Sequence, residues 1–221
     1  MRGLVYKDFH LFFKSIDKKL ILVAAAAVAL LMVSAENFSG FLAAIMFAAT
    51  IGIQNTMSFA CDEQVNWKKY QLTMPVSAGC VVGSKYLSVL MTAGISAAAG
   101  AVLYLISTAI YGGFDTDILF ATVAVSVIVP VVWTAICLPL TYWLGFKSAQ
   151  AVRLLVILPI FYLITYFEDG PGFIELANTL SSYLFAGFAV SCGLFIVSYF
   201  ISIPGYARKN KCGAEAKPAL G

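Results

Sequence analysis

Long apolar runs without charged residues alternate with short polar segments along the whole chain. The third and fourth runs are each long enough to cross a hydrocarbon core of about 30 Å as tilted helices. The fifth run is short and contains Pro159, and the sixth ends at Pro204-Gly205. The charge-free runs lie at residues 20–35, 41–60, 86–111, 118–144, 154–167 and 183–203. This pattern predicts an all-α polytopic membrane protein with six transmembrane helices and one membrane domain, residues 20–205, followed by a tail at 206–221.

The positions of the charges predict the orientation of these helices. All 14 Lys and Arg residues lie before the first run, in alternate loops, or after the last run, whereas the remaining loops carry only acids. Because Lys and Arg in short loops stay in the cytoplasm, both termini are expected there. Hydrophobic residues make up 61% of the chain and charged residues 11%, which leaves no room for a sizeable soluble domain. The basic residues are explained by topology, so we expect no nucleic-acid partner.

Residues 1–19 form a separate N-terminal segment. Apolar residues recur there at helical spacing and three lysines fall on the opposite face, which predicts an amphipathic interfacial helix. Leu4 and Leu11 break this pattern. The helix is therefore either a simple membrane anchor or an elbow helix packed beside the bundle. The apolar positions are Val5, Phe9, Phe12, Phe13, Ile16 and Leu20, and the lysines are Lys7, Lys14 and Lys18.

The six runs contain no ionisable residue except cysteine and tyrosine, and no cluster in the chain has the spacing of a metal site. An autonomous enzyme or pump is therefore not expected, and energy for transport would come from another chain. Mildly polar residues in the second run (Thr50, Gln54, Asn55 and Ser58) favour hydrogen bonding between helices over lining a translocation path. Gly94 with Ala98, and Ala97 with Ala101, predict close helix approach. Pro130 and Pro139 free backbone carbonyls in the fourth run.

Residues 61–85 form the largest internal cytoplasmic loop. On a helix, Glu63, Trp67 and Tyr70 share one face, which gives an acid and two large aromatic side chains for a protein partner. The alternative is that Trp67 and Tyr70 lie at the level of the lipid headgroups, beside Lys68 and Lys69. Pro75 is expected to end or redirect this helix.

The start GLVYKDFHLFFKS, the six runs, and the elements LTMPVS and SKYL in and after this loop resemble the permease subunits of type 2 ATP-binding-cassette (ABC) exporters. More narrowly, the chain resembles compact bacterial permeases of bacteriocin, lantibiotic-immunity and phenol-soluble-modulin export systems. The resemblance implies a dimer of permeases in the bacterial cytoplasmic membrane with two separate ATPase subunits. These subunits bind ATP and Mg, so this chain carries no cofactor. It also implies export of an amphipathic or hydrophobic substrate, with a peptide favoured.

The resemblance assigns two groups of residues. A helix that couples the permease to the ATPase maps onto Asp62, Glu63, Trp67, Lys68, Lys69 and Tyr70, and an extracellular or re-entrant cap at 168–182 includes Gly170, Pro171, Gly172 and Phe173. Two other functions stay open from the sequence. One is the binding subunit of a small-molecule uptake system, and the other is a membrane anchor or assembly protein without transport activity.

Overall fold

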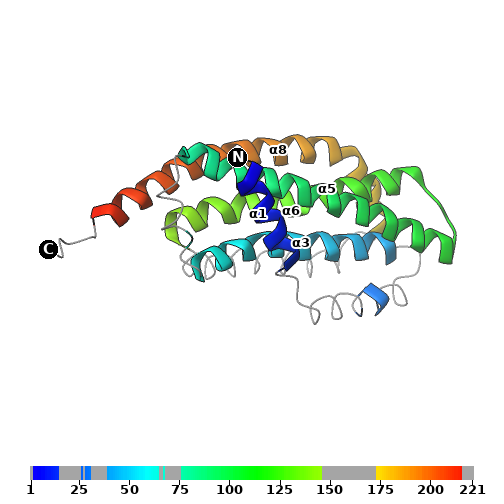
Figure 1. Cartoon of the computed structure of the whole chain (residues 1–221). Coiled ribbons are helices and arrows are strands. Elements are labelled where there is room, and N and C mark those ends of the chain that lie inside the picture. The colour runs from blue at the N-terminus through cyan, green and yellow to red at the C-terminus, as the bar shows by residue number, and fades with distance from the viewer. Residues whose placement is uncertain are drawn as a thin grey trace.

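The computed structural model describes residues 2–14, 26, 28–30, 39–64, 67, 76–145 and 173–215, and every element in these ranges is a helix. Four long helices lie alongside one another, and a short N-terminal helix lies across them (Figure 1). The elements are α1 (Arg2–Lys14), α3 (Ser39–Gln64), α5 (Ala78–Tyr111), α6 (Thr116–Leu144) and α8 (Phe173–Glu215). Helices α3, α5 and α6 pack against one another, α8 packs on α6 and α5, and α1 packs on α5 and α3.

Four helices in the described ranges are long and apolar enough to cross a membrane: Ser39–Thr56, Ala78–Tyr111, Thr116–Leu144 and Leu184–Arg208. They correspond to the second, third, fourth and sixth runs. Most of the first run and all of the fifth lie outside the described residues, so the total of six spans stays a prediction. The described part of the chain is therefore all-helical, and its four apolar helices support a multi-pass membrane protein.

The directions of the four long helices fit an even number of crossings. In Figure 1, α3, α6 and α8 run toward the end where α5 begins, as the second, fourth and sixth spans of a six-span protein would. Lys85 lies near the start of α5 and Arg208 near the end of α8, whereas Asp115 and Asp117 lie at the start of α6. We call the end where α3 and α6 terminate and α5 begins the basic end of the bundle.

Ser77, the last residue of the MPVS element, caps the start of α5. Ser77 has an extended backbone, and its hydroxyl accepts a hydrogen bond from the Cys80 amide, as an N-cap residue does. At the far end of α5, Gly112 and Gly113 adopt positive φ angles of 77°, which glycine adopts without strain. Asp115 then caps α6 by accepting from the Asp117 amide at 2.8 Å. The α5–α6 pair is therefore a helical hairpin with defined caps.

Small and hydroxyl-bearing side chains bring the helices into contact. Several of their hydroxyls bond to carbonyls of their own helix, and these side chains take little space. On α5 the buried stripe is Ser84, Ser88, Thr92, Ser96, Gly100 and Ser107. Gly94 and Ala98, by contrast, are exposed. Ala97 and Ala101 are half-buried, so within this chain the helix contacts use the serine and threonine stripe of α5 and not the Gly94–Ala98 pair.

Proline in α6 creates a contact with α8. Pro139 has no amide hydrogen, so the carbonyl of Ala135 loses its partner within the helix. The Ser198 hydroxyl lies 2.6 Å from that carbonyl and donates to it, and it also lies 2.6 Å from the Tyr86 hydroxyl. The carbonyl that the sequence predicted to be freed is thus used to join α6, α8 and α5.

Helix α8 differs from the expected sixth span. It begins at Phe173 and continues through Pro204-Gly205 to Glu215, so the helix extends beyond the apolar run at both ends. Gly205 allows this course because it packs against the Trp143 ring, where an added Cβ would lie 2.7 Å from ring atoms. Phe173 is the first residue of this helix, and Gly170, Pro171 and Gly172 lie outside the described residues, so the proposed cap is not tested.

Helix α1 packs on the bundle, which supports the elbow-helix alternative. Leu4, Asp8 and Phe12 form its inner side, with Asp8 and Phe12 buried and Leu4 packed against the core cluster of α5, α6 and α8. Tyr6 and His10 point away and stack on each other. The inner face is rotated from the predicted one, because Phe13 is 49% exposed and a carboxylate occupies the centre of the contact.

Candidate functional site

A closed ring of four charged side chains joins α1, α3 and α5 at the basic end. Lys7 contacts Asp62 at 2.6 Å and Asp8 at 3.2 Å, and Lys85 contacts Asp62 at 2.7 Å and Asp8 at 2.8 Å. Positive and negative groups alternate around the ring, so its formal charge is zero. Three of the four side chains are at least four-fifths buried, with Lys85 at 6% and Asp8 at 3% side-chain exposure.

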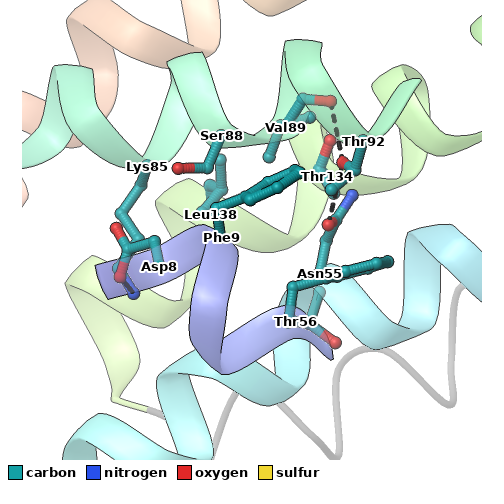
Figure 2. Close-up of a pocket in the computed structure, with 11 residues that line it drawn as sticks. Asp8, Phe9, Asn55, Thr56, Lys85, Ser88, Val89, Thr92, Thr134 and Leu138 are labelled. Atoms are coloured by element: carbon teal, nitrogen blue, oxygen red, sulfur yellow. Dashed lines mark hydrogen bonds and ion pairs between the residues drawn. The ribbon is translucent and has the colours of Figure 1, made fainter. Parts of the chain in front are cut away.

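Lys85 lies inside helix α5 and not in the loop before it. The sequence placed this lysine in the cytoplasmic lead-in to a helix starting at residue 86, whereas α5 starts at Ala78 and includes Lys85 about two turns further on. Its ammonium points across to Asp8 of α1 (Figure 2). A buried lysine is tolerated there because two carboxylates neutralise it and accept its hydrogen bonds.

Trp67 of the predicted coupling group lies next to this ring. The Lys7 ammonium is 4.5 Å from the centre of the Trp67 ring, which is cation–π geometry. Lys7 therefore contacts both Asp62 and Trp67. Trp67 is half-buried and not part of a fully exposed aromatic face, since α1 covers part of it. This contact with protein was not foreseen by either alternative for Trp67.

The other predicted coupling residues are placed only in part. Glu63 lies in the last turn of α3, which is longer than predicted and ends at Gln64, and Lys68, Lys69 and Tyr70 lie outside the described residues. Sequence reasoning missed Lys7, Asp8 and Lys85 as site residues. The available signal was the Lys7-Asp8 pair on one helix, together with an isolated lysine beside a long apolar run.

In the described part, Asn55 and Thr50 of the candidate translocation residues make hydrogen bonds to another helix and within α3. Asn55 and Thr56 border a cavity of about 20 Å³, room for about one water molecule, between α1, α3, α5 and α6 (Figure 2). The Asn55 side-chain oxygen accepts from Thr92 of α5 at 3.0 Å, which is interhelical bonding. Thr50 bonds to the Met46 carbonyl of its own helix, and Gln54 is buried. Ser58 is helical, but its side chain is not described.

No cluster that could hold a metal ion occurs among the residues described. The chemistry brought together at the basic end is ionic and aromatic, with Lys, Asp and Trp side chains, and these groups join helices. The arrangement is suited to transmitting movement from the end of α3 to α1 and α5.

Comparison with known families agrees with a transport role. A family model described as ABC-2 family transporter protein matches residues 3–207, nearly the whole chain. The chain belongs to the ABC-2 transporter family. No curated protein and no solved structure matches it significantly. ABC-2 proteins are membrane subunits of ABC transporters that cooperate with ABC ATPase subunits and are generally non-catalytic.

Membership of the ABC-2 family is consistent with the geometry. The matched region begins in α1 and ends in α8, so it includes the charged ring and all four long helices. The resemblance found in the sequence is therefore confirmed at the level of the family. The narrower bacteriocin, lantibiotic or phenol-soluble-modulin subgroup stays a prediction.

Proposed function

We propose that this chain is the permease subunit of an ABC exporter in the bacterial cytoplasmic membrane. Two permeases, either two copies of this chain or this chain and a related one, work with two cytoplasmic ATPase subunits. The ATPase subunits bind ATP and Mg and hydrolyse the nucleotide. The permeases move an amphipathic or hydrophobic substrate outward, and a peptide is the substrate class that we favour.

The observation that carries the proposal is the attachment of the coupling residues to the bundle. Asp62 is bonded to Lys85 of α5 and to Lys7 of α1, and Trp67 lies under the same Lys7. A protein that pressed on the segment following α3 would therefore act directly on three helices. This arrangement is what an energy-coupling contact requires, because displacement of a loosely held loop would not reach the spans.

The apolar character of the spans supports the substrate class. The described helices carry no Asp, Glu, Lys, Arg or His between residues 39 and 61, 86 and 114, 118 and 144, or 184 and 207. A surface of this kind suits a substrate with a large apolar face. It offers few groups for a strongly polar solute, whose desolvation would be uncompensated.

The test of coupling compares two tryptophans at the basic end. Trp67→Ala should weaken binding of the ATPase subunit that co-purifies with the tagged full chain by about 30-fold, since aromatic hot spots contribute about 2 kcal/mol or more. Trp143→Ala is the matched control. The Trp143 ring also lies near a cation, with its centre 5.9 Å from the Arg208 guanidinium, but Trp143 belongs to α6 and contacts α8.

Binding is measured by titrating the purified ATPase onto detergent-solubilised permease, with ATP hydrolysis as a second readout. Equal binding by the wild-type chain and Trp67→Ala would contradict the coupling role of Trp67. Absence of any ABC ATPase from the wild-type preparation would contradict the exporter itself. The substrate class is tested with the reconstituted complex, where an amphipathic helical peptide should stimulate ATP hydrolysis and a hydrophilic peptide of equal length should not.

A further inference from the structure

Lys7 occupies a junction between the charged ring and the coupling segment. Its ammonium is 2.6 Å from the Asp62 carboxylate and 4.5 Å from the centre of the Trp67 ring. Within the ring it has the highest side-chain exposure, 21%, so it lies at the outer edge, where the ring borders Trp67. One side chain of α1 thus contacts both Asp62 and Trp67, which are five positions apart in the sequence.

The ring determines where Lys7 can lie. Lys7 and Asp8 are neighbours on α1, and they face Asp62 and Lys85 with opposite charges. Sliding α1 by one residue would place a carboxylate where the ammonium now lies and bring like charges together. A buried pair of like charges is strongly unfavourable, so one docking register of α1 is selected.

The same register determines the surroundings of Trp67. A cation over an aromatic ring is attracted by the negative charge of the ring face, and the attraction depends on the position of the cation. Because Lys85 and Asp8 fix α1, and α1 carries Lys7, the ring orients the cation that holds Trp67 against the bundle. Nothing in the sequence pattern linked residue 7 to residue 67.

We propose that Lys7 is a positioning residue for the coupling segment: it holds Trp67 in the orientation that the ATPase subunit recognises and joins that segment to α1. The proposal rests on the proposed function for its ATPase partner. It adds α1 to the elements that respond when the ATPase displaces Trp67. Asp8 and Lys85 act through Lys7 and Asp62, by fixing the register of α1.

The first experiment measures the position of Trp67 in the full chain without any partner. Trp133→Phe and Trp143→Phe leave Trp67 as the single fluorescent tryptophan. Removing the ammonium with Lys7→Met should expose the ring and raise its acrylamide quenching constant about two-fold, because a cation–π contact of roughly 1 kcal/mol no longer holds it. Lys7→Arg should restore the wild-type value. Lys14→Met, an exposed lysine on the same helix, is the control and should change nothing.

The second experiment measures ATPase binding in a double-mutant cycle. Lys7→Met should weaken binding of the co-purified ATPase subunit by about 5- to 10-fold. In the Trp67→Ala background the same change should have little further effect, because a positioning residue acts only through the residue it positions. A residue that merely stabilises the fold would weaken binding equally in both backgrounds.

The outcomes separate the two proposals. Unchanged quenching of Trp67 in Lys7→Met overturns the positioning role, whatever the binding result. An equal loss of binding with and without Trp67 also overturns it. Failure of the wild-type chain to bind an ABC ATPase refutes the proposed function, whereas quenching still decides whether Lys7 holds Trp67.

Discussion

Replacing Lys85 with methionine would remove one of the two ammonium groups of the charged ring and keep most of the length of the side chain. The lost contacts are those to Asp8 at 2.8 Å and Asp62 at 2.7 Å. The two carboxylates would then share Lys7, which already lies 2.6 Å from Asp62 and 3.2 Å from Asp8. The buried site would change from neutral to a charge of minus one.

The expected decrease in the free energy of unfolding follows from this uncompensated charge. Breaking a buried ion pair by removing one partner typically costs about 3–5 kcal/mol. Lys7 still offsets one carboxylate and Asp62 keeps some exposure, so the lower part of that range, about 3 kcal/mol, is expected. For a chain of this size, such a loss lowers the unfolding temperature by roughly 6–12 °C.

The assay is thermal unfolding of the detergent-purified chain, followed by circular dichroism. Lys85→Met is compared with Asp8→Asn, with the double variant, and with the exposed control Lys14→Met. The double variant removes one positive and one negative group and leaves the neutral Lys7–Asp62 pair. The double variant should therefore lose less unfolding free energy than the sum of the losses in the two single variants, by about 1–3 kcal/mol. An unfolding temperature for Lys85→Met within about 1 °C of wild type, or strict additivity, would refute the reasoning.

Two further predictions concern packing and topology. Gly100→Ala should lower the free energy of unfolding by about 1–3 kcal/mol, because the added Cβ would collide with the Ser126 hydroxyl. On the same helix, a Cβ added at Gly94 meets nothing within 4 Å, so Gly94→Ala should leave the unfolding temperature unchanged or raise it. In a background otherwise free of cysteine, Asp115→Cys in the exposed α5–α6 turn should react with an impermeant thiol reagent added to intact cells, and Cys80 near the basic end should react only after lysis. Labelling of both from outside would contradict the cytoplasmic position of the basic end.

Hydropathy was sufficient to predict the membrane class and the four described spans, since long charge-free runs have few other stable structures. It misplaced the helix ends for a physical reason. Charged residues were taken to mark the limits of a span, so Lys85 was placed outside the third helix, and α3 was ended before Asp62. Both are helical because each finds an opposite charge on another helix, and sequence spacing does not reveal such a partner.

The docking of α1 could not be decided from its periodicity. The hydrophobic face pointed to Phe13, but Asp8 lies on the buried side because its partners are on α5 and the same helix. A hydropathy scale assigns a carboxylate to the outside, since it treats each residue alone. The resemblance did supply Asp62 and Trp67, yet the connection of both to Lys7 required the tertiary structure.

The alternation of charge explains why a stable membrane bundle would retain four ionic groups at one end. Well-packed apolar residues of similar volume often stabilise as much as a buried ion pair does, so stability alone does not account for the ring. Apolar contacts, however, tolerate sliding of one helix past another by a residue. After such a shift, an alternating ring would place like charges next to each other. We therefore infer that the ring mainly defines the register between α1, the end of α3 and the start of α5. For the coupling role proposed above, a defined register means that a displacement of Trp67 by the ATPase subunit moves three helices together.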